Sequence, residues 1–411
     1  MNTTGIPSFS GDRLLQARKA RGLFMTNLAP MVGVSRQQLS DYENGRAKPS
    51  EGTLQAIART LGFPARFFLI EPPKPVAHQV FWRSRRSETK TAREMTGQRI
   101  AWTYELLARI EAEVQLPEVD LPDLDLPSDF RMLQDDVIEA TADAARRAWR
   151  LGTRAISDVT LVLENAGIPV SMIEIPSDKQ DGFLFLAADD RGDLLERPIL
   201  GVNVCGASAA RARFDVAHEL GHLLLHRRVR EADLKLSANH KMIEDQANRF
   251  ASAFLFPREA FLDSVHLPSL EEFLSLKKHW GFSIAAMVQR AYALEMIDDD
   301  RRQSLFISMA RRRWRGRGRE PYDDQMPIER PRMLRRALET LEYDGGVRRQ
   351  DLLREFALPG EELIQICGLD EDYFQNKVEP FPLRMRAPRN DAQTEASDAE
   401  VIDFFRRGSV K

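Results

Sequence analysis

The chain of 411 residues has few cysteines, no long apolar run and no strong excess of charge of one sign. Its two cysteines, Cys205 and Cys367, lie far apart and lack metal-ligand spacing, which excludes a disulfide framework or a cysteine metal site. No stretch approaches the roughly 18 uninterrupted apolar residues of a membrane span, and the first residues lack the apolar core of a signal peptide. We therefore expect a cytoplasmic protein with no membrane partner.

Positive charge is concentrated at the N-terminus, although the whole chain carries a net charge of −3. Residues 1–70 contain nine Lys or Arg and four Asp or Glu. This asymmetry is typical of a nucleic-acid-binding module joined to a more acidic body. A hydrophobic content of 43% allows full cores, and the length suggests two or three domains.

Glycines and capping residues divide the N-terminal module into short helices. The third helix begins with a capping box, in which Ser35 is the N-cap and Gln38 lies three residues after it. The second and third helices are joined by a turn that contains Gly33, which makes them a candidate helix-turn-helix. The first three helices are expected at residues 13–21, 26–32 and 35–44, and two more begin at Ser50 and Pro64.

The sequence from Leu14 to Phe63 resembles the lambda-repressor/Cro-like helix-turn-helix domains. Matching residues include Ala29, Gly33, Val34, Ser35, Leu39, Tyr42, Glu43, Asn44, Gly45 and Pro49. The resemblance implies that the third helix reads a double-stranded DNA operator, since Arg can pair with guanine and Gln with adenine. Lys48 would contact phosphate. The expected DNA-binding residues are Ser35, Arg36, Gln37, Gln38, Ser40, Asp41 and Lys48.

Two positions depart from the pattern of these domains. They usually place a phosphate-contacting Gln early in the second helix, where this chain has Met25. Pro30 falls inside the same helix and removes a backbone hydrogen bond. A helical module used only for dimerisation or docking is therefore the alternative to a DNA-binding one.

Residues 218–222 read His-Glu-Leu-Gly-His on an expected apolar helix at 208–226. Two histidines four residues apart project from one helix face, about one turn apart, and can hold one Zn²⁺. Glu219 is rotated by roughly 100° from His218, so it lies beside the metal and can accept a proton from water. Gly221 lowers helix propensity by about 1 kcal/mol relative to Ala and indicates that another backbone approaches closely. A helix that carries two histidines by chance is the alternative.

A catalytic zinc takes three protein ligands and leaves the fourth position open. A second apolar helix at 240–257 supplies Glu244 as the third ligand. Asn248, four residues later on the same face, is expected to accept a hydrogen bond from a ligand imidazole. Asp245 is the rival ligand, but it points about 100° away.

Two further histidines lie near this motif. His226 continues the row of His218 and His222, but the outer two histidines are roughly 12 Å apart along the helix and cannot share one ion. We interpret His226 as a helix C-terminal residue stabilised by the helix dipole. His240, one turn before Glu244, either stabilises an oxyanion or is a surface histidine.

The segments RFDVAHELGHLLLH and EDQANRFASAFLFP together resemble the ImmA/IrrE-type zinc metallopeptidases. Their signature is a HExxH helix followed by a helix of the form E-x-x-A-N-x-F-A-x-x-L-x-x-P. Phe254 stands where the pattern has Leu, a change that concerns packing. The resemblance implies a metallo-endopeptidase whose relatives cleave repressor proteins and so switch transcription. Matching residues are His218, Glu219, His222, Glu244, Ala247, Asn248, Phe250, Ala251 and Pro257.

We expect a mainly α protein with a small β-sheet, of the α+β class. An all-helical helix-turn-helix domain is followed by a zincin-like metallopeptidase domain and a helical C-terminal extension. The predicted parts are 1–70 for the helix-turn-helix domain, 71–130 for a connecting helix and a Pro-rich acidic linker, 131–265 for the peptidase, 266–383 for the extension and 384–411 for a disordered tail.

The connecting helix is expected at 89–115, where it is also a possible dimer strut, and the basic stretch Phe81–Arg86 before it is expected to be solvated or to face phosphate. In the peptidase part, Ile199–Val204 is our candidate for the strand that holds the substrate backbone. The expected strands are 168–175, 182–188 and 198–204.

The sequence thus predicts a DNA-binding transcriptional regulator, expected to be a homodimer, fused to a Zn²⁺-dependent metallo-endopeptidase. Its expected substrate is a protein, such as a repressor or antitoxin. The alternative is a non-catalytic regulator whose zinc domain senses a ligand. Glu219 weighs against this alternative, because a sensor needs no general base.

Overall fold

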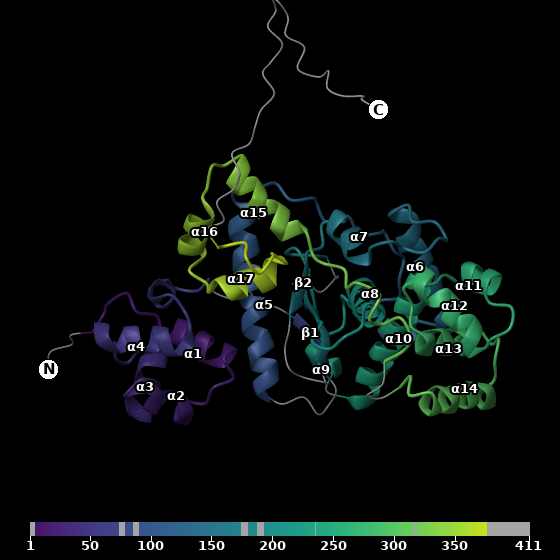
Figure 1. Cartoon of the computed structure of the whole chain (residues 1–411), viewed down its shortest axis with the longest axis horizontal. Coiled ribbons are helices and arrows are strands. Elements are labelled where there is room, and N and C mark those ends of the chain that lie inside the picture. Colours follow the sequence, from purple (N-terminus) through teal and green to yellow (C-terminus); the bar gives the residue numbers. More distant parts are fainter. Residues whose placement is uncertain are drawn as a thin grey trace, which may run out of the picture. The chain divides into compact units, whose positions relative to one another are not determined.

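The computed structural model describes residues 5–73, 79–84, 90–173, 180–186, 193–234, 236–315 and 319–375 (Figure 1). Helices dominate, and the described strands form one four-stranded sheet, which confirms the α+β class. The predicted tail at 384–411 lies outside the described residues. A search of the described helices finds none that is long and apolar enough to cross a membrane.

The N-terminal domain is built from short helices that agree with the capping pattern of the sequence. Ser35 is the N-cap of the third helix, and both hydrogen bonds of the capping box are present, from the Gln38 amide to Ser35 Oγ and from the Ser35 amide to Gln38 Oε1. Pro30 lies one residue before the end of the second helix, which continues to Met31. The elements are α1 (Gly11–Ala20), α2 (Met25–Met31), α3 (Arg36–Glu43), α4 (Glu51–Leu61) and the 3₁₀ helix η1 (Ala65–Leu69).

A buried ion pair joins α1 to α3. The guanidinium of Arg18 donates two hydrogen bonds to the carboxylate of Glu43, with N–O distances of 2.5 and 2.8 Å. The Arg18 and Glu43 side chains are only 9% and 3% exposed. This bidentate geometry fixes the first helix against the third, because a buried charge is tolerated only when it is paired.

Helix α5 (Lys90–Glu111) confirms the helix predicted at 89–115, but its environment differs from the prediction. Trp102 is fully buried and lies edge-on against the rings of Phe63 and Phe67. The predicted connector is therefore a packed helix that completes the core beside the N-terminal domain. The helical spacing of its apolar residues predicted apolar faces, but it could not indicate which elements would cover them.

The sheet has the strand order β1-β3-β4-β2. β1 and β4 both pair with β3 in antiparallel orientation, and β2 pairs with β4 in parallel. The predicted strands are all present. β1 is an additional strand that overlaps the stretch Phe81–Arg86, which we expected to be solvated or to face phosphate. Arg85 and Arg86 lie outside the described residues. The strands are β1 (Gln79–Ser84), β2 (Val170–Ile173), β3 (Gln180–Leu186) and β4 (Ile199–Asn203).

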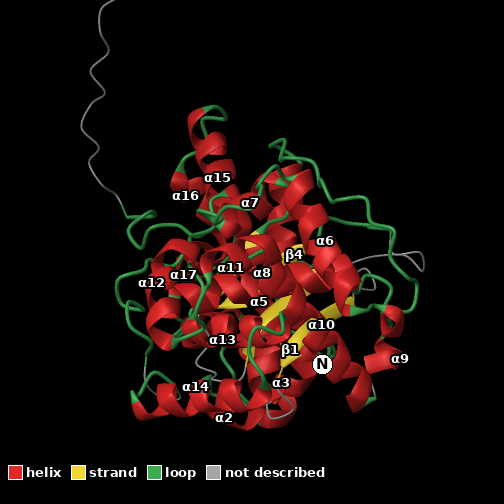
Figure 2. Cartoon of the chain, turned by 90° about the vertical axis from the view of Figure 1, so that its right-hand side faces the viewer, coloured by secondary structure: helices red, strands yellow, loops and turns green. Residues whose placement is uncertain are grey.

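Strand β3 separates two apolar cores. Leu184 and Leu186 belong to the core that contains α8 (Ala209–Leu225), whereas Phe183 and Phe185 belong to the core that contains α5. This alternation follows from the period of two along a strand. The sheet therefore lies among helices (Figure 2).

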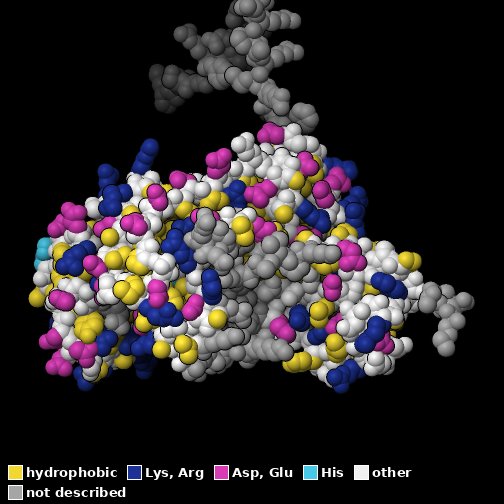
Figure 3. All heavy atoms as spheres, turned by 180° about the vertical axis from the view of Figure 1, so that it is seen from behind, with side chains coloured by type: hydrophobic (Ala, Val, Ile, Leu, Met, Phe, Trp, Pro, Cys, Tyr) yellow, Lys and Arg dark blue, Asp and Glu magenta, His cyan; other side chains and the backbone are white. Residues whose placement is uncertain are grey.

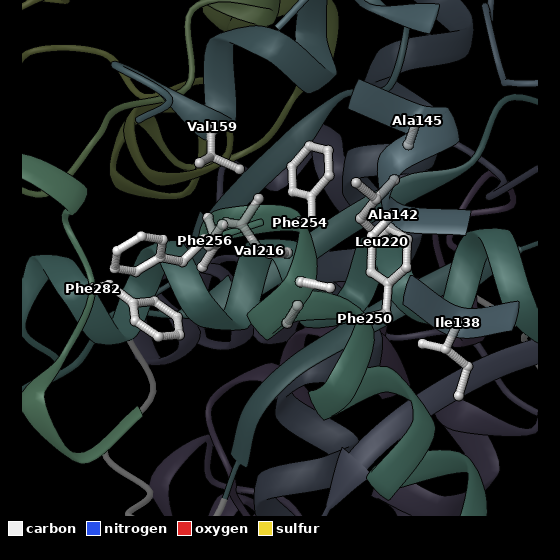
Figure 4. Packing of buried hydrophobic residues seen from close by; sticks show 14 of the residues in the cluster. Ile138, Ala142, Ala145, Val159, Val216, Leu220, Phe250, Phe254, Phe256 and Phe282 are labelled. Carbon is white, nitrogen blue, oxygen red and sulfur yellow. The ribbon is translucent and has the colours of Figure 1, made fainter. Parts of the chain in front are cut away.

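Helix α10 (Ser237–Leu255) packs beside α8 and against α6 (Asp135–Ala148). Phe250 and Phe254 of α10 lie among Leu220 of α8 and Ala142 of α6 (Figure 4). This packing holds the two motif-bearing helices together.

The remaining elements surround this centre. Residues 112–129 contain no helix or strand, as the Pro-rich composition predicts, and the Asp120 amide donates to the Ala166 carbonyl oxygen. Acidic and basic side chains are interspersed among other residues over the described part of the face shown in Figure 3. The other helices are η2 (Phe130–Met132), α7 (Val159–Asn165), α9 (Glu231–Leu234), α11 (Arg258–Ser264), α12 (Leu270–Trp280), α13 (Ile284–Ala293), α14 (Asp299–Arg311), α15 (Met333–Tyr343), α16 (Arg349–Phe356) and α17 (Gly360–Cys367).

Candidate metal site and DNA interface

The structure brings together the three residues that the sequence proposes as metal ligands. One ligand atom from each of His218, His222 and Glu244 lies within 4.8 Å of the others. The two histidine Nε2 atoms are 3.0 Å apart, and they lie 3.6 and 3.4 Å from the carboxylate oxygens of Glu244. A tetrahedral ion with bonds of about 2.05 Å places its ligand atoms roughly 3.3 Å apart, so the spacing of the set fits Zn²⁺.

The outer nitrogen of His218 has the partner that the sequence predicts. His218 Nδ1 lies 3.0 Å from Asn248 Oδ1. A carbonyl oxygen only accepts, so the His218 proton is placed on Nδ1. The lone pair of Nε2 is then directed towards the other two ligands.

The Nδ1 atom of His222 begins a buried chain of hydrogen bonds through His226 and Gln246, which we call the relay. The sequence did not predict it. His222 Nδ1 lies 3.0 Å from His226 Nδ1, and His226 Nε2 lies 2.9 Å from Gln246 Oε1. The amide nitrogen of Gln246 donates to the Phe130 carbonyl oxygen at 2.8 Å, which fixes the amide orientation. His226 therefore donates from Nε2 and accepts at Nδ1, and the proton of His222 is on Nδ1.

These tautomers leave two Nε2 lone pairs facing each other at 3.0 Å. Without a cation this arrangement is repulsive, whereas a cation between the nitrogens is attracted by both. The donor set of two imidazoles and one carboxylate is also one that catalytic zinc uses. The residues present therefore fit a bound Zn²⁺.

The carboxylate of Glu244 is poised to be ionised. Burial would raise its pKa, but in their protonated form His218 and His222 donate hydrogen bonds and contribute positive charge that outweigh burial and lower the pKa below its usual range. A divalent cation that replaces these Nε2 protons would leave an anionic carboxylate next to two neutral imidazoles, which is the protonation state that binds metal.

Glu219 is fully buried and lies against strand β3. A Cβ atom added at Gly182 would come within 2.5 Å of Glu219 Oε1. Only glycine at this position leaves room for the carboxylate. The sequence did not indicate this role of Gly182, because the contact joins residues 37 positions apart and leaves no local pattern.

Gly221 has a close backbone contact, as the sequence predicts from the low helix propensity of a glycine inside a helix. A Cβ atom at Gly221 would lie 3.2 Å from Ala247 Cα and 3.3 Å from the Ala247 carbonyl oxygen. The glycine therefore lets α8 and α10 approach closely enough for Glu244 to reach the histidines of α8.

The interpretation of His226 as a residue stabilised by the helix dipole is wrong. Its side chain is fully buried, and burial together with the charge of His222 lowers its pKa to about 3. A neutral imidazole gains nothing from a helix C-terminus as a cation would. The available signal was the row of three histidines on an apolar helix, which indicates burial of the third.

Two further residues were alternatives in this region. Asp245, the rival ligand, is exposed and lies outside the metal-ligating group. His240 is half-buried one turn before Glu244. Strand β4, our candidate for substrate binding, lies between β3 and β2, so it offers no free edge and that prediction is wrong.

The predicted recognition helix presents a polar surface. Arg36 and Gln37 are exposed, and Gln37 donates to Asp41, which also pairs with Arg46. Ser40 is half-buried, and the side chains of Ser35 and Gln38 form the capping box.

Lys48 has a different environment from the one predicted. Its ammonium donates to the carbonyl oxygen of Phe9, so it is held by its own domain. Its predicted contact with phosphate remains a prediction.

Comparison with known families agrees with this two-part architecture. Residues 14–68 match a helix-turn-helix family, and residues 163–292 match the IrrE N-terminal-like domain, a peptidase family. The chain thus carries a helix-turn-helix domain of the XRE type at its N-terminus and a metallopeptidase-like domain of the ImmA/IrrE type in its central part.

Similar curated proteins match short stretches of the chain, of 51 to 59 residues. The HTH-type transcriptional regulator DdrOP3 of Deinococcus deserti is 43% identical over 51 residues, 12% of this chain and 40% of that protein. The SPbeta prophage-derived uncharacterized HTH-type transcriptional regulator YonR of Bacillus subtilis is 34% identical over 59 residues, 14% of this chain and 55% of that protein. An uncharacterized transcriptional regulator in the ATPase CF(0) region of Rhodospirillum rubrum is 41% identical over 58 residues, 14% of this chain and 54% of that protein. The chain thus spans 40–55% of the length of these relatives.

Proposed function

We propose that the protein is a DNA-binding transcriptional regulator whose central domain is a zinc-dependent metallo-endopeptidase. The observation that carries the proposal is the convergence of His218, His222 and Glu244, with the carboxylate of Glu219 on the next residue of the same helix. The proposed substrate is a protein of the repressor or antitoxin type. Expected partners are an operator and a second copy of the chain.

The residues of the site have separate roles in peptide hydrolysis. His218, His222 and Glu244 would hold Zn²⁺, whose Lewis acidity acidifies water and polarises a peptide carbonyl. Glu219 accepts the proton of the attacking water and delivers it to the leaving amine. Asn248 and His226 orient the two imidazoles through their Nδ1 atoms.

Helix α3 is the proposed DNA-reading element. Arg36 and Gln37 are exposed on its first turn, where recognition helices meet base edges. Ser35 and Gln38 support this role by fixing the start of the helix through the capping box.

The first test measures metal content. The purified chain should contain about one Zn²⁺, and alanine at His218 or Glu244 should lower occupancy. Glu219→Gln should keep it, because that side chain is not among the proposed ligands. Full occupancy in Glu244→Ala would remove Glu244 from the ligand set.

The second test separates a peptidase from a ligand sensor. Target transcription is measured in wild type, Glu219→Gln and His218→Ala strains, with and without the inducing condition. The peptidase proposal expects Glu219→Gln to bind metal and DNA but to leave the target genes unresponsive. A normal response in Glu219→Gln, with a lost response in His218→Ala, would establish the sensor instead.

A further inference from the structure

Strand β3, which lies against Glu219, is covered along one edge by the chain's own strand β1. We infer that β1 occupies in cis the position at which an extended peptide substrate adds to the sheet, so that substrate binds only after β1 has left. This inference rests on the proposed peptidase function, and it names the form of the substrate as a strand that pairs with β3.

Strand β3 is the strand that meets the proposed general base. Gly182 lies in β3, and a Cβ atom there would come within 2.5 Å of Glu219 Oε1. A peptide strand paired with β3 would run beside this residue, about 4.8 Å away in the plane of the sheet. Its backbone would therefore pass close to the carboxylate that handles the proton.

Strand β1 already lies in that position. It pairs with β3 in antiparallel orientation, from Gln79 opposite Leu186 to Ser84 opposite Gln180. The register shifts between Trp82 and Ser84, because two residues of β3, Asp181 and Gly182, lie opposite the single residue Arg83; the bulge is therefore in β3 and includes Gly182. Bulges of this kind are common beside active sites, where they change the course of a strand.

The other edge of β3 cannot accept a peptide. β4 pairs with it from Gly182 to Phe185, and β4 is itself covered by β2. Extended peptides commonly bind proteins by adding a strand to a sheet edge. Along β3, this is possible only where β1 now lies.

A tethered strand competes strongly with a free peptide. A segment that belongs to the same chain as its site competes at an effective concentration that reaches the millimolar range. Release of β1 should therefore raise the affinity for a matching free peptide by on the order of 100-fold.

The experiment weakens β1 in the full-length, zinc-loaded chain. Alternate residues of an antiparallel strand donate to their neighbour, so Val80→Pro/Phe81→Pro removes at least one bond to β3 in either phase of the ladder. The proline variant and its parent both carry Glu219→Gln, which prevents cleavage of the peptide. Binding of a fluorescent synthetic peptide of residues 79–84 is measured by anisotropy, and hydrogen exchange reports the protection of the β3 amides.

A disulfide provides the opposite perturbation. Ser84→Cys/Gln180→Cys joins two directly paired positions, whose Cα atoms are about 4.5–5.5 Å apart, within disulfide range. Cys205→Ser removes the exposed native thiol, and Cys367 is buried. The oxidised protein should bind the peptide at least tenfold more weakly than the same protein after reduction.

The inference is supported if the proline variant gains affinity and faster exchange in β3, while the oxidised protein loses affinity. It is overturned if the folded proline variant binds no better than its parent, or if oxidation changes nothing. If the proline variant does not fold, the oxidised and reduced proteins decide. Restoring Glu219 then tests the proposed function separately: a proline variant that binds the peptide but does not cleave a repressor-type protein would count against the peptidase and leave the inference about β1 intact.

Discussion

His226 offers the sharpest test of how the metal site is built. His226→Phe keeps an aromatic ring but removes the Nδ1 acceptor that faces His222 at 3.0 Å. Zinc binding through Nε2 requires the His222 proton on Nδ1, and in the variant that proton is buried without an acceptor. The metal-free protein escapes the penalty, because its imidazole can move the proton to Nε2. The substitution should therefore weaken metal binding specifically.

The size of the effect follows from the burial of these atoms. His222 is 2% exposed and His226 is 0% exposed, so water does not replace the lost acceptor. A buried donor without a partner costs about 1–3 kcal/mol. At about 1.4 kcal/mol per factor of ten, this corresponds to roughly 5- to 150-fold weaker zinc binding. In other metal sites, loss of a residue that hydrogen-bonds to a metal ligand lowers metal affinity by about 10- to 100-fold.

Competition with a chromophoric chelator measures the affinity. His226→Asn is the matched variant, because its Oδ1 stands where Nδ1 was and still accepts from His222; most of the affinity should return. His266→Asn makes the same change at an exposed histidine and should have no effect. Wild-type affinity in His226→Phe, or an equal loss in both His226 variants, would show that the relay does not position His222.

Three other predictions concern separate parts of the chain. Gly182→Ala should leave zinc content unchanged but lower peptide hydrolysis by on the order of 100-fold, because a Cβ atom displaces the Glu219 carboxylate; unchanged hydrolysis would contradict this placement. Arg36→Ala should weaken discrimination at one base pair of a selected operator by about 1–3 kcal/mol, and a uniform loss across all sequences would indicate a phosphate contact instead. Glu43→Gln should lower the free energy of unfolding by about 3–5 kcal/mol in chemical denaturation, because Arg18 stays buried without its carboxylate; a loss below about 1 kcal/mol would show that the pair is not needed.

The sequence by itself determined the features that depend on short-range geometry. Helix periodicity places His218 and His222 on one face, and the same rule places Glu244 and Asn248 together four residues apart. The capping box at Ser35 is equally local, because both of its hydrogen bonds span three residues. Strands β2 to β4 could also be located from short apolar runs, although their order could not.

Only the tertiary structure decided which of these elements meet. The burial of His226 depends on Gln246, twenty residues away on another helix, and the space for Glu219 depends on Gly182 in a strand. β1 was missed because six residues near a basic stretch indicate a strand only when a partner is known, and its partner lies about a hundred residues further along the chain. The position of β4 inside the sheet could not be predicted for the same reason. Pairing between distant strands is set by the packing of the whole chain, which leaves no periodic signal in any one segment.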